Sequence, residues 1–271
     1  MRRLLIRPGA IGDCILGFPA LESLKADYTE VWLPSSAVPL VQFAGAVRSL
    51  SSTSIDLAGL GGLEMPPRLY ESLKSFDSIV SWYGAKREEF RQAIFETGVP
   101  CEFHPALPPA GYAGHATDFF ASQVGAPQGL SPHIEVKPAQ CRNSIVIHPF
   151  SGGVRKNWPL ENYRRLADGL PLKIDWTCGP EEELPGATRF ADLASLASWI
   201  RGARLYIGND SGITHLAAAA GCPTLALFGP TNPAVWAPRG RNVRVLHSRS
   251  LTDLTVETVL AAANRLLDSL S

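Results

Sequence analysis

Short apolar runs alternate with segments whose apolar residues recur at helical spacing, and this alternation repeats along most of the chain. Residues 3–7 form the first apolar run, and a loop with two glycines follows it at 8–13. Beyond the loop, apolar residues return every three or four positions from Ile15 to Leu24, which is typical of an amphipathic helix. The pattern therefore predicts a strand, a glycine-containing turn and a helix.

The same alternation starts again near the middle of the chain. Residues 144–148 form an apolar run, and a loop with two further glycines follows it at 149–153. Strands that alternate with helices pair in parallel and are covered by helices on both faces. Further strands are predicted at 172–177, 205–207 and 224–228, and helices at 160–170, at 193–200 and from Gly212 onward.

Fewer elements can be assigned in the rest of the first half. Strands are predicted at 30–33 and 78–82, and helices at 86–96 and 116–124. The segment 44–75 is rich in Gly, Ser and Pro and has weak periodicity, so it predicts no particular element.

The segment 126–143 carries several prolines and glycines and no helical pattern, which is typical of a connection between domains. We expect a short strand within it at 133–136. The sequence thus predicts an α/β protein with two Rossmann-like, doubly wound parallel-sheet domains, 1–140 and 141–271, that face each other across a cleft. It leaves open whether the last amphipathic helix, 253–269, packs back on the first domain.

The composition of the 271-residue chain fits an ordinary globular protein, with 45% hydrophobic and 8% aromatic residues. Lysine plus arginine and aspartate plus glutamate each total 25, so the formal net charge is zero. Such a chain has no bulk positive field to attract nucleic acid. We therefore expect no nucleic-acid partner.

The cysteines and the apolar segments favour a cytoplasmic protein. The five cysteines are an odd number and lie far apart in the sequence, which favours neither a zinc site nor a disulfide framework. The apolar run at 3–7 ends too early for a signal peptide, and the later segment 216–229 is interrupted by Gly221 and Pro223. We expect no membrane span, although the protein can still touch a membrane surface.

Polar residues follow two neighbouring predicted strands in the second half. Asp210 and Ser211 precede the helix that starts near Gly212, and Thr231 follows the next strand. Ligands of open α/β sheets bind at the carboxyl ends of strands, and a helix start offers N–H donors and a positive dipole end to phosphate. The segment therefore predicts a phosphate site. His215 shares a helix face with Ser211, although a lone helical histidine also fits a structural role.

A glycine loop with neighbouring cations follows the strand that ends at His148. Ser151 and Gly152 open this loop, and Lys156 follows them. Main-chain N–H groups and an ammonium can approach phosphate oxygens together, although a solvated surface loop explains the same residues. The acids at 181–183 can accept hydrogen bonds from ribose or form a solvated helix start. No His, Cys, Asp or Glu cluster has metal-ligand spacing, so we expect no metal site.

The glycine loop of the first half is followed by an acidic residue. Gly9, Gly12 and Asp13 have the spacing G-x-x-G-D, which differs from the dinucleotide fingerprint G-x-G-x-x-G. Asp13 lies at the start of the predicted helix, at the carboxyl end of its strand. There it can accept a proton from a hydroxyl nucleophile, or it is an acidic helix-start residue that the dipole favours.

Three groups of motifs together resemble glycosyltransferase family nine, which contains the ADP-heptose heptosyltransferases of lipopolysaccharide core synthesis. In order, they lie at 7–13 with 18–21, at 148–149 with 156–159, and at 209–215 with 228–231. The resemblance implies a GT-B fold whose first domain binds the acceptor and whose second domain binds the nucleotide sugar. It also implies inversion at the anomeric carbon with no essential metal or other cofactor.

The resemblance further implies transfer of heptose or a related sugar from an ADP-type donor to a hydroxyl of a lipid-linked, lipopolysaccharide-core-like saccharide. Such an enzyme is expected in the cytoplasm, peripheral to the inner membrane. By position, Asp13 matches the catalytic base and Lys156 the cation that neutralises the diphosphate. One of the acids at 181–183, for which we take Glu182, matches the ribose-binding residue. The predicted donor- and phosphate-binding residues are Gly12, Ser151, Gly152, Glu182, Asp210, Ser211, Gly212, His215 and Thr231.

Two departures from the family pattern concern the substrates. Asn157 stands where a second basic residue is common, and Ser151 is the one hydroxyl residue left after the histidine–proline pair. Two other functions stay open, a GT-B-like epimerase and a protein that binds a nucleotide sugar without transferring it. The acceptor, the exact donor and the oligomeric state are open as well.

Overall fold

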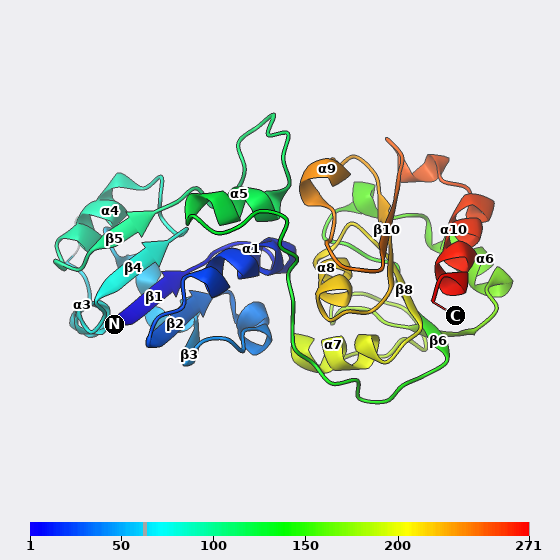
Figure 1. Cartoon of the computed structure of the whole chain (residues 1–271), viewed down its shortest axis with the longest axis horizontal. Helices are drawn as coiled ribbons and strands as arrows, with labels where there is room; N and C mark the ends of the chain where they lie inside the picture. Colours follow the sequence, from blue (N-terminus) through cyan, green and yellow to red (C-terminus); the bar gives the residue numbers. More distant parts are fainter. Residues whose placement is uncertain (62–63, 271) are drawn as a thin grey trace. The chain divides into compact units, whose positions relative to one another are not determined.

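The computed structural model describes residues 1–61 and 64–270; Gly62, Leu63 and Ser271, which fall inside the predicted domains, lie outside the described residues. The chain divides into two compact units, Met1–Tyr112 with Ala116–Leu130, and Ala113–His115 with the chain from Ser131 onward. Each unit holds a five-stranded sheet, and all strand pairs are parallel (Figure 1). The predicted α/β class with two doubly wound sheets is confirmed.

The first sheet has the strand order β3-β2-β1-β4-β5. The chain adds β2 and β3 on one side of β1 and then crosses to its other side for β4 and β5. The switch point, where an open α/β sheet binds ligands, therefore lies between β1 and β4. The strands are β1 (Arg2–Ile6), β2 (Tyr28–Leu33), β3 (Ala46–Ser49), β4 (Ser78–Ser81) and β5 (Cys101–Phe103).

Helices cover both faces of the first sheet. Leu4 and Ile6, which share one face of β1, lie in a core with residues of α3 and α4. Arg7, just beyond β1, turns to the opposite face, where its side chain lies against Gly17 of α1 and Phe120 of α5. The helices are α1 (Ile11–Ser23), α2 (Leu50–Thr53), α3 (Pro67–Lys74), α4 (Glu88–Phe95) and α5 (Ala116–Gln123), with 3-10 turns η1 (Ser35–Leu40) and η2 (Ile55–Leu57).

The second sheet has the strand order β10-β9-β8-β6-β7, so its switch point lies between β6 and β8. β6 and β8 are buried along their whole length, as expected for central parallel strands. The strands are β6 (Ser144–His148), β7 (Lys173–Trp176), β8 (Leu205–Asn209), β9 (Thr224–Phe228) and β10 (Val243–His247). The helices are α6 (Leu160–Gly169), α7 (Leu193–Arg201), α8 (Gly212–Ala219), α9 (Pro233–Trp236) and α10 (Val256–Asp268), with 3-10 turns η3 (Val154–Lys156) and η4 (Leu251–Asp253).

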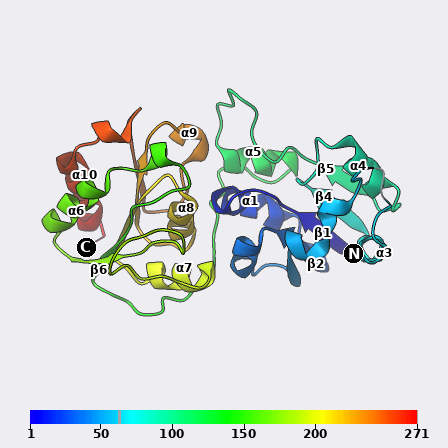
Figure 2. The ribbon, with the colours of Figure 1, turned by 180° about the vertical axis from the view of Figure 1, so that it is seen from behind.

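The last helix, α10, has its apolar face filled within the second unit. Val259, Ala263 and Leu266 belong to one buried cluster with Ile145 of β6 and Leu166 of α6. Figures 1 and 2, which view the chain from opposite sides, both show α10 beside α6. The sequence left open where this helix packs. In the structure its apolar face packs against α6 and the sheet of the second unit.

The structure departs from the sequence prediction in the short and peripheral strands. The strand expected at 133–136 is wrong, because the main chain there makes a single bond, from Ile134 N to Ala219 O at 2.9 Å, and no ladder. The edge strands β3, β5 and β10 were not predicted. Each is largely half-exposed, and β3 and β5 have only four and three residues, so none has the fully buried apolar run that marks β6 or β8.

Two further expectations can be compared with the described residues. All five cysteines are free thiols. Within 1–61 and 64–270, no helix combines the length and apolarity that crossing a membrane requires.

Candidate active site

Two loops meet at the switch point of the second sheet. β6 and β8 are neighbours, with His148 opposite Gly208 at their carboxyl ends. The chain leaves β6 into the loop that carries Ser151 and Lys156, and it leaves β8 directly into Asp210. Because parallel strands end at the same edge of a sheet, the predicted phosphate-binding residues of both loops are brought to one place.

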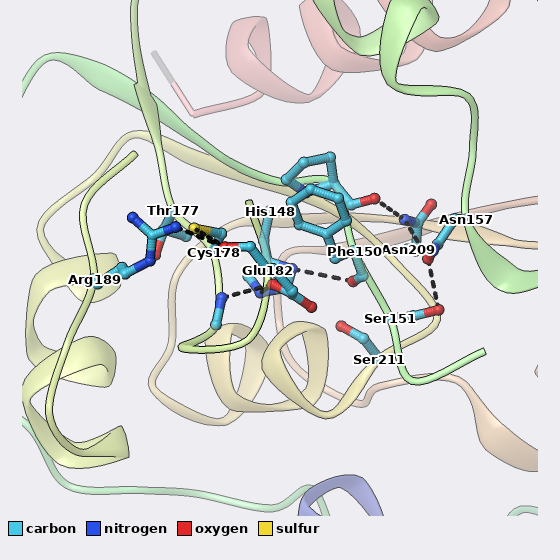
Figure 3. Close-up of polar contacts among 12 residues, drawn as sticks. His148, Phe150, Ser151, Asn157, Thr177, Cys178, Glu182, Arg189, Asn209 and Ser211 are labelled. Atoms are coloured by element: carbon cyan, nitrogen blue, oxygen red, sulfur yellow. Dashed lines mark hydrogen bonds and ion pairs between the residues drawn. The ribbon is translucent and has the colours of Figure 1, made fainter. Parts of the chain in front are cut away.

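Asn209, the last residue of β8, joins these two loops. Its buried side chain accepts hydrogen bonds at Oδ1 from Trp158 N at 3.0 Å and from the Tyr163 hydroxyl at 2.9 Å. Its Nδ2 donates to Pro149 O at 2.7 Å, which Figure 3 shows as a dashed line. The amide therefore fixes both ends of the segment that carries Lys156. The sequence analysis assigned Asn209 no such role.

Lys156 and Asp210 form an ion pair, with 2.7 Å between Nζ and Oδ2. The two groups differ in exposure, since the Asp210 side chain is 6% exposed and that of Lys156 is 39% exposed. Main-chain bonding also holds Asp210, whose N–H donates to Leu227 O at 2.9 Å. A fixed buried carboxylate thus orients an ammonium that still reaches solvent and can meet an anionic ligand.

Helix α8 starts beside this ion pair. Ser211 is its N-cap, and the hydroxyl accepts a hydrogen bond from Thr214 N at 3.4 Å. The preceding N–H groups, including that of Gly212, have no intrahelical acceptor and suit an anion. His215 lies one turn further on and is buried; burial lowers its pKa to about 4, while the nearby Asp210 acts in the opposite direction. The ring is therefore neutral near pH 7.

Glu182 is the acid of the 181–183 group that turns toward β6. Its Oε2 accepts a hydrogen bond from Gly179 N at 2.6 Å and lies 3.5 Å from His148 Nε2 (Figure 3). Glu181 and Glu183 are exposed. Burial lowers the pKa of His148, and the Glu182 carboxylate opposes that shift. A carboxylate held by a main-chain N–H beside a buried ring offers an acceptor to ligand hydroxyls.

The remaining predicted residues of the second unit lie on loops. The Ser151 hydroxyl donates to Asn157 Oδ1 at 2.8 Å, so it stabilises the loop that leads to Lys156 (Figure 3). Gly152 follows it, and no atom lies within 4 Å of the position that a side chain would take there. Thr231 lies between β9 and α9 and is partly exposed.

Asp13 lies in the first turn of α1, where the sequence predicted it, and Gly12 precedes it. The carboxylate folds back over the glycine loop, and its Oδ2 accepts a hydrogen bond from Ala10 N at 3.1 Å. Gly9, with φ of +122°, permits this, because a side chain there would lie 2.9 Å from Asp13 Cβ. The loop thus holds the carboxylate at the carboxyl end of β1.

A pocket of about 780 Å³ lies at the same end of the first sheet. Its walls come from the glycine loop, from the chain after β4 and from the proline-rich segment after β5. They include Pro8, Trp82, Tyr83, Lys86, Leu107 and Phe119. Rings, prolines and a cation at the carboxyl ends of β1, β4 and β5 make a surface on which a sugar can stack.

Within the described part of the chain, no group of three or more His, Cys, Asp or Glu side chains has an arrangement that could hold a metal ion. The cation present at the switch point of the second sheet is the ammonium of Lys156.

Two doubly wound parallel sheets in series are the architecture of the GT-B fold. The structure of Escherichia coli ADP-heptose LPS heptosyltransferase II superposes on this chain with a TM-score of 0.76 and 18% identity. The superposition covers 100% of this chain and 99% of the other. E. coli heptosyltransferase WaaC with ADP has a TM-score of 0.70 and 16% identity, covering 98% of this chain and all of the other. Residues 121–259, over half of the chain, match glycosyltransferase family 9 (heptosyltransferase), and the chain belongs to this family.

Individual relatives agree with this assignment. Lipopolysaccharide heptosyltransferase 1 of Pseudomonas aeruginosa is 36% identical over 104 residues, which are 33% of this chain and 29% of the relative. The alignments with the E. coli heptosyltransferase 1 sequences span 37% and 38% of those relatives. Lipooligosaccharide heptosyltransferase 2 of Haemophilus influenzae is 24% identical, over 98% of this chain and 99% of its own. The predicted family resemblance is confirmed, whereas the predicted role of each residue stays a prediction.

Proposed function

We propose that the chain is an inverting glycosyltransferase that transfers heptose or a related sugar from an ADP-type nucleotide sugar to a hydroxyl of a lipopolysaccharide-core-like saccharide. The observation that carries the proposal is the Lys156–Asp210 ion pair beside the start of α8, where the N–H groups that precede Thr214 have no intrahelical acceptor. A solvent-accessible ammonium and a helix start at a switch point suit a diphosphate.

The donor is proposed from the second unit. Lys156 and the N–H groups at the start of α8 hold the diphosphate, with Ser151, Gly152 and Thr231 on the surrounding loops. Glu182 accepts hydrogen bonds from the ribose. An ADP-linked donor is supported by the structures of E. coli heptosyltransferase WaaC with ADP and with ADP-2-deoxy-2-fluoro heptose.

The chemistry follows from the charges of the groups involved. Asp13 accepts the proton of the acceptor hydroxyl. At the same time the oxygen of that hydroxyl bonds to the anomeric carbon, from the face opposite the diphosphate. The bond from that carbon to the diphosphate breaks, and ADP leaves with the electron pair. Lys156 and the α8 N–H groups stabilise the negative charge that builds up on the leaving group. This division of labour requires no metal, and the proposal includes none.

The acceptor is proposed to be a lipid-linked saccharide at a membrane surface, with the enzyme in the cytoplasm and peripheral to the inner membrane. The relatives named lipopolysaccharide heptosyltransferases support this class of acceptor. The ring-lined pocket of the first unit offers a surface for a saccharide.

The test combines binding with turnover. ADP-, GDP- and UDP-sugars are compared by thermal shift, because a ligand that binds the native state raises its unfolding temperature. The best donor is then incubated with lipopolysaccharide that lacks heptose, and the product is identified by mass spectrometry and by the anomeric configuration in NMR. Stabilisation by an ADP-sugar followed by transfer with inversion is expected.

Each other outcome rejects the proposal in a defined way. Donor binding without transfer to any such acceptor would indicate a nucleotide-sugar-binding protein. A changed sugar in the absence of acceptor would indicate an epimerase. Stabilisation by UDP- or GDP-sugars alone would reject the ADP-type donor.

A further inference from the structure

Arg7 is a buried cation. It lies one residue beyond β1, immediately before the glycine loop that leads to Asp13. The residue is 1% exposed, and its guanidinium bonds to main-chain carbonyls rather than to carboxylates. Burial lowers its pKa to about 10, so the group stays protonated near pH 7. A buried charge is costly unless its surroundings compensate for it, so the contacts of Arg7 define what it can do.

Aromatic rings supply part of that compensation. The guanidinium carbon lies 4.0 Å from the centre of the Phe120 ring of α5 and 5.9 Å from that of Trp82 after β4. Such cation–π contacts are strong where water is excluded. They hold the planar group in one orientation between α1 and the pocket of the first unit.

Hydrogen bonds from the two ends of the guanidinium reach two different segments. Nη2 donates to Asp13 O at 2.9 Å, in the first turn of α1. Nη1 donates to Ala106 O at 3.2 Å, in the segment after β5 that lines the pocket. One rigid, planar side chain thus joins the main chain of the proposed base to a pocket wall that is more than ninety positions away in the sequence.

Gly17 of α1 makes room for this arrangement. A Cβ atom at that position would lie 3.0 Å from Arg7 Nε, an atom that has no hydrogen-bond partner among the described residues. Alanine is the better helix former, so a glycine in the interior of α1 has its explanation in the guanidinium packed against it.

We propose that Arg7 is a positioning residue of the acceptor side, which sets the spacing between the Asp13 carboxylate and the wall of the pocket at Ala106. The inference rests on the proposed function in so far as Asp13 is the base and the pocket holds the acceptor. The geometric part, a tether between two segments, stands without it.

The decisive variants are Arg7→Met, which keeps the volume and removes the charge and both hydrogen bonds, and Arg7→Lys, which keeps the charge but not the two-sided contact. Arg3→Met is the matched control. Arg3 lies on β1, which Arg7 follows, and it binds the other end of α1, through Nη1 to Leu24 O at 3.0 Å; it also bonds through Nε to Ser78 Oγ at 3.1 Å. Both substitutions therefore remove an arginine that links α1 to β1.

The first measurement is steady-state kinetics with both substrates varied. Arg7→Met is expected to lower kcat/KM for the acceptor by about 100-fold through a higher acceptor KM and a lower kcat, as for a misplacement of about 1 Å. The KM for the donor stays unchanged, Arg7→Lys retains an intermediate activity, and Arg3→Met keeps the kinetic constants of the parent. A lower kcat with unchanged acceptor KM in both arginine-to-methionine variants would overturn the proposal, because that result indicates only a smaller folded fraction.

The second measurement needs no turnover. Hydrogen exchange of the unliganded chain is expected to rise in Arg7→Met at 10–17 and at 104–111 together, and in Arg3→Met at neither segment. If exchange rises as expected but the parent chain itself transfers no sugar, the proposed function fails and the tether remains. If exchange in both segments stays as in the parent, the tether fails whatever the kinetics show.

Gly17→Ala is a further variant that keeps Arg7 and disturbs its seat. It is expected to raise the acceptor KM, and to have a smaller effect in the Arg7→Met background, where the guanidinium is gone. Equal effects of Gly17→Ala in both backgrounds would contradict the packing argument.

Discussion

The two units each begin a helix beside the switch point of a doubly wound sheet, and they fill that helix start with different chemistry. In α1 the Asp13 carboxylate itself accepts the hydrogen bond of the Ala10 N–H. In α8 the neutral Ser211 is the cap, and the carboxylate of Asp210 is paired outside the helix with Lys156. One helix start therefore carries its own anion, whereas the other carries none within its first turn. A shared topology fixes where a site forms, and the side chains at the first turn decide what it binds.

The buried residue one turn further on sharpens the contrast. Cys14 in α1 and His215 in α8 are each four residues after their cap, and burial raises the pKa of the Cys14 thiol to about 12. Burial lowers the pKa of His215 to about 4. Both groups are uncharged near pH 7, so the charges at the two helix starts come from Asp13 in α1 and from Asp210 and Lys156 beside α8.

The largest expected effect comes from removing the anion of α1. Asp13→Asn keeps the shape of the first turn but cannot accept a proton, so kcat should fall by about 10²–10⁴-fold with an unchanged Kd for the donor. Quenched product assays and calorimetry with the donor measure the two quantities. Glu88→Gln is the matched control, since Glu88 is a first-turn acid of α4; parent-like turnover in Asp13→Asn would refute the base assignment.

Removing the cation of the second site should have the next largest effect. Lys156→Met is expected to lower kcat by about 100-fold, because one preorganised donor to the leaving group is lost. It should also destabilise the fold, because the buried Asp210 carboxylate loses its partner. The loss is expected to be only about 1 kcal/mol, because Lys156 is part-exposed and water weakens the ion pair.

Two variants separate these consequences. Lys156→Met with Asp210→Asn should recover stability in urea unfolding but not turnover. Lys173→Met removes the lysine of a second Lys–Asp pair, in which Nζ lies 3.0 Å from Asp175 on β7, and should leave turnover intact. A loss of turnover in both lysine variants alike would deny Lys156 a specific role.

A smaller effect is expected from the acid that faces β6. Glu182→Gln should raise the KM for the donor by about tenfold with little change in kcat, because the loss falls on a hydrogen bond to a charged group. Glu183→Gln, at the exposed neighbouring position, is the control. If both variants raise the donor KM equally, the carboxylate turned toward His148 is not the one that binds ribose.

The last prediction concerns stability and its dependence on pH rather than turnover. The unfolded chain binds a proton at His215 near pH 6.5, whereas the folded chain does so near pH 4. This contribution to stability is present above pH 6.5 and is lost as the pH falls toward 4, by up to about 3 kcal/mol. The free energy of unfolding, measured with urea between pH 7 and pH 4.5, should fall less steeply with falling pH in His215→Gln than in the parent. Identical slopes would mean that the native ring is not held neutral.

Much of the fold follows from local pattern. The central strands β1, β6, β8 and β9 were predicted from their apolar runs, and helices such as α1 and α6 from apolar residues at helical spacing. β10 was missed because its residues alternate between exposed and half-buried positions at an edge. The predicted strand at 133–136 failed for the opposite reason, since an apolar residue such as Ile134 can be buried without a strand partner.

The sequence by itself determined the α/β class, the family resemblance and the places of Asp13, Lys156 and Asp210, because short-range spacing encodes burial and loop position. The tertiary structure decided which acid of 181–183 turns inward, that Asn209 fastens two loops, and that Arg7 joins α1 to the segment at Ala106. The contacts of Glu182 with His148, of Asn209 with Pro149 and of Arg7 with Ala106 join residues far apart along the chain. Strand order brings them together, and strand order leaves no periodic trace in the sequence.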